Sequence, residues 1–310
     1  MGLVLLLAVG ALITTLLVVG WTIHAITRPP RRTYASALAK GRPGEPSQLM
    51  PGPDGAPRTF ESWTIEHRGE HLPVWDMQGD ASDGPAVILS HGWGDSRVGA
   101  LTRAHFLLPL ASRIIMWDMP GHGDAPGTTR MGVDEHVALR TLVERVAASG
   151  STRVVLMGWS LGAGVSIRAM SEWREPAAQC VRGVIAEAPY RLALTPARNM
   201  LRLFGMPHGW IAEWAMGVIG VDLGVGWTWN KREAFDRAVH TGKLGVPALV
   251  LHGEKDEISP VADGEAIAAA AAAAGIFVKL PEGEHHGLWT TEATATACYE
   301  AVRAFMQRLA

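Results

Sequence analysis

The chain has 310 residues, 48% of them hydrophobic, which is enough to bury the core of one large domain and slightly rich for a chain without membrane contact. Its 28 Lys and Arg nearly balance 30 Asp and Glu, and the net charge of −2 gives no electrostatic case for nucleic-acid binding. The two cysteines, Cys180 and Cys298, lie far apart and fit two buried free thiols as well as one disulfide.

The hydrophobic excess lies at the N-terminus. From Leu3 to Ile23 the sequence carries no charge, and as a helix these roughly 20 residues would rise about 30 Å, the thickness of a hydrocarbon core. A cleaved secretory signal is the competing interpretation, but a basic start and a cleavage site of small residues are both missing. We therefore expect a single-pass membrane anchor over residues 1–27. Arg28, Arg31 and Arg32 follow it, so the positive-inside rule predicts that the rest of the chain lies in the cytoplasm.

Residues 28–58 are crowded with Pro, Gly and Arg and show no periodicity, which predicts an extended tether rather than a folded unit. Residues 59–310 read as one domain. Two strands, Phe60 to His67 and His71 to Met77, open it, and alternating strand and helix patterns follow. This alternation predicts an α/β fold with a mostly parallel central sheet flanked by helices.

The alternation breaks between about residues 190 and 240, where we expect a helical cap inserted over the sheet. This insertion is rich in large apolar side chains, which either pack the cap helices or line a pocket for an apolar acyl group. They are Trp210, Trp214, Trp227, Trp229, Met200, Met206 and Met216.

A serine flanked by glycines marks the most informative turn. Gly158-Trp159-Ser160-Leu161-Gly162 follows the apolar strand from Arg153 to Met157 and precedes a helix-forming stretch, Ala163 to Trp173. A sharp turn from strand to helix lifts a serine hydroxyl clear of the sheet, and the glycines leave room where a Cβ would collide with backbone. Ser160 is therefore the candidate nucleophile, provided that a base can reach it.

An acid and a base follow in the order that such a turn normally precedes. Asp256 comes directly after the apolar strand Val246 to Leu251, and His285 follows the strand Ile276 to Leu280. Loops after parallel strands meet at one edge of a sheet, so the imidazole of His285 is expected to take the proton of Ser160 while the Asp256 carboxylate orients the ring.

Several neighbouring groups compete for these roles. His286 is adjacent to His285, and Glu254 and Glu257 flank Asp256 as solvated loop charges. Glu187 follows another strand and is an alternative acid, although a loop or pocket carboxylate is the favoured interpretation.

The segment His91-Gly92-Trp93-Gly94-Asp95 follows the apolar strand Ala86 to Leu89 and brings a glycine-rich loop to the same edge of the sheet. The backbone N–H groups of Trp93 and Leu161 are expected to form an oxyanion hole there. His91 and His122 are expected to shape their loops through ring hydrogen bonds.

These motifs resemble the α/β-hydrolase-fold serine hydrolases, near the monoacylglycerol-lipase-like and serine-aminopeptidase-like branch and its membrane-anchored relatives, over about residues 60–310. Asp118 to Gly123 and Glu187 to Tyr190 are similar to further loops of that family. The resemblance implies Ser160 as nucleophile, Asp256 as acid, His285 as base, and Trp93 and Leu161 as oxyanion donors. Asp124 departs from the family pattern, whereas the run Glu-Gly-x-His-x-Gly-x-Trp aligns best when His285 is the base.

The expected function is hydrolysis of an acyl ester, as in a carboxylesterase or lipase, through an acyl-enzyme. No metal-binding or nucleotide-binding motif is present, so neither a metal nor a cofactor is expected. The expected partners are a small, apolar acyl substrate and the membrane, without nucleic acid. A thioesterase and an aminopeptidase are the alternatives, and the latter needs a cap carboxylate for the substrate ammonium, with Glu213 and Asp222 as candidates. A non-catalytic hydrolase-fold binding protein at the membrane is the alternative of another class.

Overall fold

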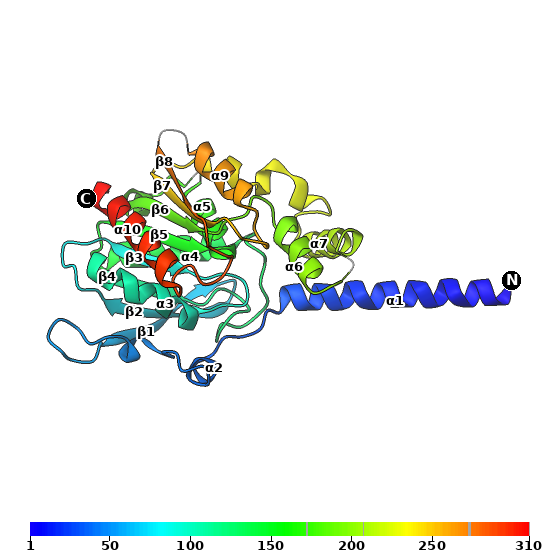
Figure 1. The fold of residues 1–310 in the computed structure, drawn as a ribbon, viewed down its shortest axis with the longest axis horizontal. Coiled ribbons are helices and arrows are strands. Elements are labelled where there is room, and N and C mark those ends of the chain that lie inside the picture. Colours follow the sequence, from blue (N-terminus) through cyan, green and yellow to red (C-terminus); the bar gives the residue numbers. More distant parts are fainter. Residues whose placement is uncertain (172, 207, 272–273, 310) are drawn as a thin grey trace.

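The chain forms a layered α/β domain from which one long helix projects (Figure 1). The structure is a computed structural model that describes residues 1–310 except 172, 207, 272–273 and 310.

Over the described residues, the central sheet has eight strands in the order β1-β2-β4-β3-β5-β6-β7-β8. Strand β2 runs antiparallel to both of its neighbours, and the pairings from β4 to β8 are all parallel. The predicted mostly parallel sheet is therefore confirmed, and the loops after its parallel strands lie at one edge. The strands are β1 (Phe60–His67), β2 (Glu70–Gln78), β3 (Ala86–Ser90), β4 (Arg113–Trp117), β5 (Val154–Trp159), β6 (Val181–Glu187), β7 (Ala248–Gly253) and β8 (Gly275–Leu280).

Helices cover both faces of the sheet. Along β5, Val155 and Met157 join the hydrophobic core on one face, while Val154 and Leu156 join the core on the other. Burial on both faces explains why the strands read as continuous apolar runs. Helices α3 (Arg97–Leu107) and α10 (Glu292–Arg308) cover the first face, and α4 (Glu135–Ala148), α5 (Leu161–Met170) and α9 (Val261–Ala270) cover the second. Short turns of 3₁₀ helix are η1 (Pro46–Gln48), η2 (Leu108–Leu110) and η3 (Pro176–Cys180).

The insertion between β6 and β7 forms a helical cap. It contains α6 (Leu194–Leu203), α7 (Trp210–Asp222), α8 (Arg237–Thr241), η4 (Trp229–Lys231) and η5 (Glu233–Phe235). Trp229 and Met216 are buried in the core of the cap, and the Trp229 indole donates to the Met216 carbonyl over 2.7 Å. Trp210, Trp214 and Trp227 are instead 46–52% exposed. Packing within the cap therefore explains the position of Trp229, whereas the other three indoles are partly exposed on the surface of the cap.

Helix α1 (Gly2–Thr27) projects from the domain beside the cap (Figure 1). Its apolar residues from Leu3 to Leu12 are largely exposed, whereas Val19 and Thr22 are buried. The C-terminal part of α1 packs against α7, so the helix is joined to the cap rather than only to the chain that follows it.

Residues 28–58 differ from the expected extended tether. They include helix α2 (Tyr34–Leu38) and lie along the domain. Arg32 pairs with Asp95 over 2.9 Å, and Arg58 pairs with Asp80 over 2.9 Å. The composition of residues 28–58 correctly predicted that this segment has no long helix or strand. It did not predict that arginines of the segment bind carboxylates on neighbouring loops.

Cys180 and Cys298 are both free thiols. Of the two interpretations that their spacing left open, the structure supports the one without a disulfide. Cys298 is fully buried on α10, where burial raises the pKa of its thiol well above the ordinary value.

Candidate active site

Ser160 lies on the sharp turn between β5 and α5. Its backbone has φ 51° and ψ −111°, a conformation that costs a residue with a side chain about 1–3 kcal/mol. The Ser160 N–H donates to the Glu187 carbonyl over 2.9 Å, which helps to hold the turn. A Cβ at Gly158 would lie 2.2 Å from the Gly162 carbonyl oxygen, and one at Gly162 would lie 2.0 Å from that of Ser90. The packing around this turn therefore requires both glycines.

The structure brings Ser160, Asp256 and His285 together from the ends of β5, β7 and β8. His285 Nδ1 lies 2.7 Å from Asp256 Oδ2, and His285 Nε2 lies 3.1 Å from Ser160 Oγ. Each of the three residues is 9% exposed, so the chain of hydrogen bonds lies just below the surface. His286 is exposed and packs edge-on against the His285 ring, with 4.8 Å between ring centroids. Of the two adjacent imidazoles, His285 is the one that reaches the serine.

The Asp256 carboxylate is held by backbone as well as by side chains. Its Oδ1 accepts the N–H groups of Ile258, over 2.9 Å, and Ser259, over 2.7 Å. Burial alone would raise the pKa of Asp256, but hydrogen bonds from His252, His285 and the Ser259 backbone outweigh it and lower that pKa well below the usual range. An ionised Asp256 favours the His285 tautomer with the proton on Nδ1, which leaves Nε2 free to accept the Ser160 proton.

His252 is a functional neighbour that sequence reasoning missed. It is fully buried at the end of β7, and its Nε2 lies 2.9 Å from the Ser259 carbonyl and 3.3 Å from Asp256 Oδ2. The Asp256 carboxylate therefore lies between two imidazoles. The available signal was position, because His252 ends the same apolar strand that leads to Asp256.

The glycine-rich loop after β3 runs directly beside Ser160. A Cβ at Gly92 would lie 3.0 Å from Cδ1 of the Trp159 indole and 3.4 Å from Ser160 Cβ, so a side chain here would crowd Trp159. Trp93 is half-buried and Leu161 is fully buried. Within the described residues, the backbone N–H groups of Trp93 and Leu161 donate to no other protein group. Two unpaired donors next to Ser160 suit a developing oxyanion.

His91 and His122 have the loop-shaping positions that we expected. His91 Nε2 accepts the Met119 N–H over 3.0 Å, and its Nδ1 bonds the Gly92 carbonyl over 2.9 Å. Burial lowers the pKa of His91, so the ring is neutral and Nδ1 carries the proton. His122 Nδ1 bonds the Pro120 carbonyl over 3.0 Å.

Among the residues that the structure describes, the Glu187 carboxylate bonds groups other than His285. It forms a buried ion pair with Arg103, whose Nε lies 2.7 Å from Glu187 Oε2, and accepts the Trp289 indole N–H over 2.8 Å. The guanidinium of Arg103 also stacks over Trp159, with 3.8 Å to the ring centroid. Glu187 thus anchors α3 and the His285 loop beneath the site.

Arg237 connects the cap to the Ser160 turn and was also missed. This buried residue of α8 donates from Nη1 to the Tyr190 carbonyl over 3.2 Å and to the Ser160 carbonyl over 3.4 Å. Its guanidinium stacks on the Tyr190 ring at 3.5 Å from the centroid. No periodicity in the sequence marks a contact between residues so far apart.

Asp256→Asn is expected to destabilise the protein at neutral pH and progressively less in acid. The pKa of an aspartate carboxyl is about 3.9 in an unfolded chain, and the pKa of Asp256 is lower than this in the folded protein. The ionised carboxylate therefore stabilises the fold fully above the unfolded pKa, and this stabilisation is lost as the pH falls from there through the folded pKa. Urea unfolding of both proteins in detergent micelles, from neutral pH down to about pH 3, measures the effect. A constant difference in unfolding free energy across this range would contradict an ionised Asp256.

Comparisons with known proteins agree with this architecture. The profile of the Alpha/beta hydrolase family matches residues 87–297. A pimeloyl-[acyl-carrier protein] methyl ester esterase of Neisseria meningitidis is 27% identical over 207 residues, which are 58% of this chain and 64% of that protein. One of Aeromonas hydrophila is 39% identical over 82 residues, which are 26% of this chain and 29% of that protein. The chain thus spans less than two thirds of the length of these two relatives.

Among solved structures, an esterase of Pyrococcus furiosus has a TM-score of 0.64 and 19% identity, covering 90% of this chain and 98% of the esterase. An acylaminoacyl peptidase of Pyrococcus horikoshii has a TM-score of 0.57 and 12% identity, covering 81% of this chain and 41% of the peptidase. At these identities the similarity establishes the fold alone. Together with the profile match over most of the domain, it shows that the chain belongs to the alpha/beta hydrolase family.

Proposed function

We propose that this protein is a membrane-anchored serine hydrolase that cleaves an acyl ester through an acyl-enzyme. The observation that carries the proposal is the continuous relay from Asp256 through His285 to Ser160, with hydrogen bonds of 2.7 and 3.1 Å. The strained Ser160 backbone supports it, because such conformations cluster at active sites, where the strain is part of the mechanism.

The first half-reaction forms the acyl-enzyme. His285 Nε2 takes the proton of Ser160 Oγ as that oxygen attacks the ester carbonyl carbon. The carbonyl oxygen gains negative charge and accepts the N–H groups of Trp93 and Leu161. The bond to the alkoxy oxygen then breaks, His285 gives its proton to that oxygen, and the alcohol leaves.

The second half-reaction repeats the relay with water. His285 takes a proton from a water molecule, whose oxygen attacks the acyl carbon and forms a second oxyanion in the same place. When the bond to Ser160 Oγ breaks, His285 returns the proton to the serine and the carboxylic acid leaves. Asp256 stays ionised and stabilises the imidazolium in both halves.

An ester is the favoured bond. The curated relatives are named as methyl ester esterases, and one structural neighbour is named as an esterase. The aminopeptidase alternative loses one of its two candidate carboxylates, because Glu213 lies in ion pairs with Arg198 and Lys231 on the outside of the cap, whereas Asp222 is exposed at the C-terminal end of α7. A carboxylate already paired in this way is poorly suited to hold a substrate ammonium group.

A substrate panel tests the proposed bond. The purified full-length protein is expected to hydrolyse p-nitrophenyl esters and methyl esters of acyl chains at least about a hundredfold faster, in kcat/KM, than aminoacyl anilides. Acyl thioesters in the same panel test the thioesterase alternative. Faster cleavage of the anilides would identify a peptidase, and failure to form any adduct with a fluorophosphonate would favour the non-catalytic alternative.

We also propose that α1 is a retained membrane anchor with the catalytic domain on the cytoplasmic side. Helix α1 is long and apolar enough to cross a membrane, as a secretory signal near an N-terminus can also be. Retention is supported by the packing of α1 on α7, which a removed signal would not serve. Arg28, Arg31 and Arg32 support the cytoplasmic side. Intact mass of the protein extracted from membranes tests retention, since cleavage would remove the mass of α1.

A further inference from the structure

The end of α1 lies against the loop that carries a candidate oxyanion donor. We call residues 26–32 the strap and residues 92–96 the oxyanion loop. Three hydrogen bonds join them, and each has a distance typical of a well-formed bond. They run from the Trp93 indole N–H to the Ile26 carbonyl at 2.8 Å, from Arg32 Nη1 to Asp95 Oδ1 at 2.9 Å, and from Ser96 Oγ to the Arg32 carbonyl at 2.8 Å.

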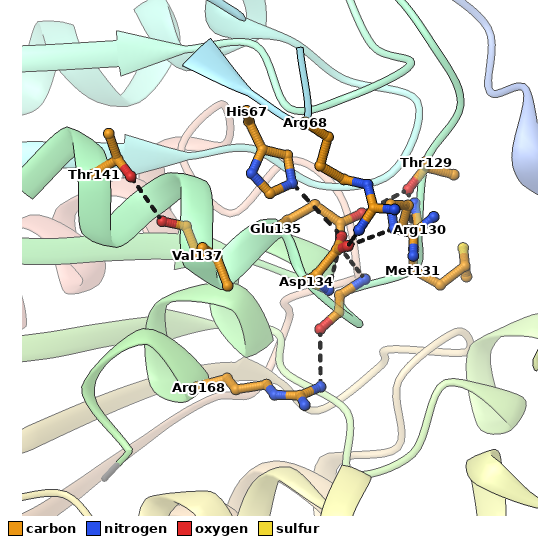
Figure 2. A network of polar contacts seen from close by, with 11 residues as sticks. His67, Arg68, Thr129, Arg130, Met131, Asp134, Glu135, Val137, Thr141 and Arg168 are labelled. Atoms are coloured by element: carbon orange, nitrogen blue, oxygen red, sulfur yellow. Dashed lines mark hydrogen bonds and ion pairs between the residues drawn. The ribbon is translucent and has the colours of Figure 1, made fainter. Parts of the chain in front are cut away.

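The strap also binds the loop between β4 and α4. Arg31 Nη1 donates to the carbonyls of Gly123, over 2.9 Å, and Ala125, over 2.7 Å, and the Thr129 N–H donates to the Thr27 carbonyl over 3.1 Å. Figure 2 shows that Thr129 belongs to a polar network in which the buried Glu135 accepts several donors from this loop. The strap is therefore bound to a well-supported part of the domain.

Trp93 occupies the junction of three parts of the molecule. Its side chain packs against both the core of the sheet and the core of the cap, and its indole N–H is bound by the last turn of α1. The backbone N–H of the same residue is a candidate oxyanion donor. Because the indole is linked to the Trp93 backbone through only two rotatable side-chain bonds, fixing the indole restricts the positions that this N–H can take.

We infer that the strap is a positioning element of the active site, which holds the Trp93 N–H in the geometry that the oxyanion requires. This inference rests on the proposed hydrolase function and adds a role for α1 beyond anchoring. Oxyanion donors act only when they are held within a few tenths of an ångström of their productive position. Full activity thus depends on an α1 that is retained and seated on the domain.

Trp93→Phe tests the inference in the full-length protein in detergent micelles, with a short, soluble p-nitrophenyl ester as substrate. The change removes the N–H that Ile26 accepts and keeps an aromatic ring in place. We expect kcat to fall about tenfold with KM nearly unchanged. This loss is smaller than the roughly 10²–10³-fold loss that follows complete removal of an oxyanion donor, because the Trp93 N–H is still present but less well held. Trp63→Phe is the matched control, because the Trp63 indole N–H also donates to an acceptor, Asp76 at 3.3 Å, but lies on the edge strand β1.

The affinity for a trifluoromethyl ketone separates positioning from a general loss of stability. Its tetrahedral adduct with Ser160 carries an oxyanion, so Trp93→Phe should weaken this inhibitor by the same factor as kcat/KM. Unchanged kcat and inhibitor affinity in Trp93→Phe would overturn the inference while leaving the proposed function intact. A wild-type protein that neither hydrolyses esters nor reacts with the inhibitor would instead overturn the proposed function.

A second pair of variants probes the strap without touching Trp93. Arg31→Gln removes the two hydrogen bonds to the β4–α4 loop and is expected to lower kcat about threefold. Arg28→Gln removes the same charge from a position of the strap that makes none of the hydrogen bonds to the domain described above. The exposed Arg28 guanidinium bonds His24 of α1 instead, so kcat should not change. Equal activities of the two variants would contradict a role of the strap.

Discussion

Ser160→Ala is expected to lower kcat for ester hydrolysis by about 10⁶-fold and to abolish labelling by a fluorophosphonate. Without Oγ no acyl-enzyme can form, and the remaining acceleration can come only from binding and the oxyanion donors. Because alanine keeps the Cβ, the packing of the turn between β5 and α5 should be retained. Stopped assays at high enzyme concentration, together with gel-based labelling, measure both effects.

Ser166→Ala is the matched control for this prediction. Ser166 is a fully buried serine on the same helix, α5, and it takes no part in the relay. Its substitution should leave both kcat and labelling near the wild-type values. If Ser160→Ala kept measurable labelling while folding like the wild type, the nucleophile would be another residue and the proposed mechanism would be wrong.

Much of the fold and the principal site residues could be predicted because buried parallel strands leave a clear signal. The apolar runs at β3, β5, β7 and β8 located four strand ends, and parallel strands bring the loops that follow their ends to one edge of the sheet. The side chains required for a nucleophile, an acid and a base then identified one serine, one carboxylate and one histidine in those loops. The structure brings together the three residues chosen in this way.

The contacts that sequence reasoning missed are those without periodicity. Arg237 reaches the Ser160 carbonyl from 77 positions away, and Trp93 reaches the Ile26 carbonyl from 67 positions away. A side chain that contacts one backbone carbonyl leaves no repeat in the sequence. The strap was missed for a related reason, since a Pro-rich and Arg-rich segment predicts only that regular secondary structure is missing and not where the segment lies.

The pair His285 and His286 shows a further limit of sequence reasoning. Of these two adjacent residues, one is buried against Ser160 and the other is exposed, and this difference depends on backbone angles that neither composition nor spacing determines. The motif around the pair favoured His285, and the 3.1 Å approach of its Nε2 to Ser160 Oγ agrees with that choice.

His285→Asn is accordingly expected to lower kcat by about 10⁶-fold, nearly as much as loss of the nucleophile, because the serine hydroxyl then has no base to take its proton. The small residual rate should rise with pH, since hydroxide replaces the missing imidazole. The pH dependence of kcat measured with a p-nitrophenyl ester, corrected for the uncatalysed reaction, tests this expectation.

His286→Asn provides the decisive comparison. It makes the same chemical change one residue further along, at an exposed ring that contacts His285 only edge-on at 4.8 Å, so kcat should stay within about threefold of the wild type. A large loss in His286→Asn with near-normal activity in His285→Asn would exchange the roles of the two imidazoles. Large losses in both variants would mean that the Asp256 carboxylate does not hold the His285 ring in place by itself and that His286 also positions this ring.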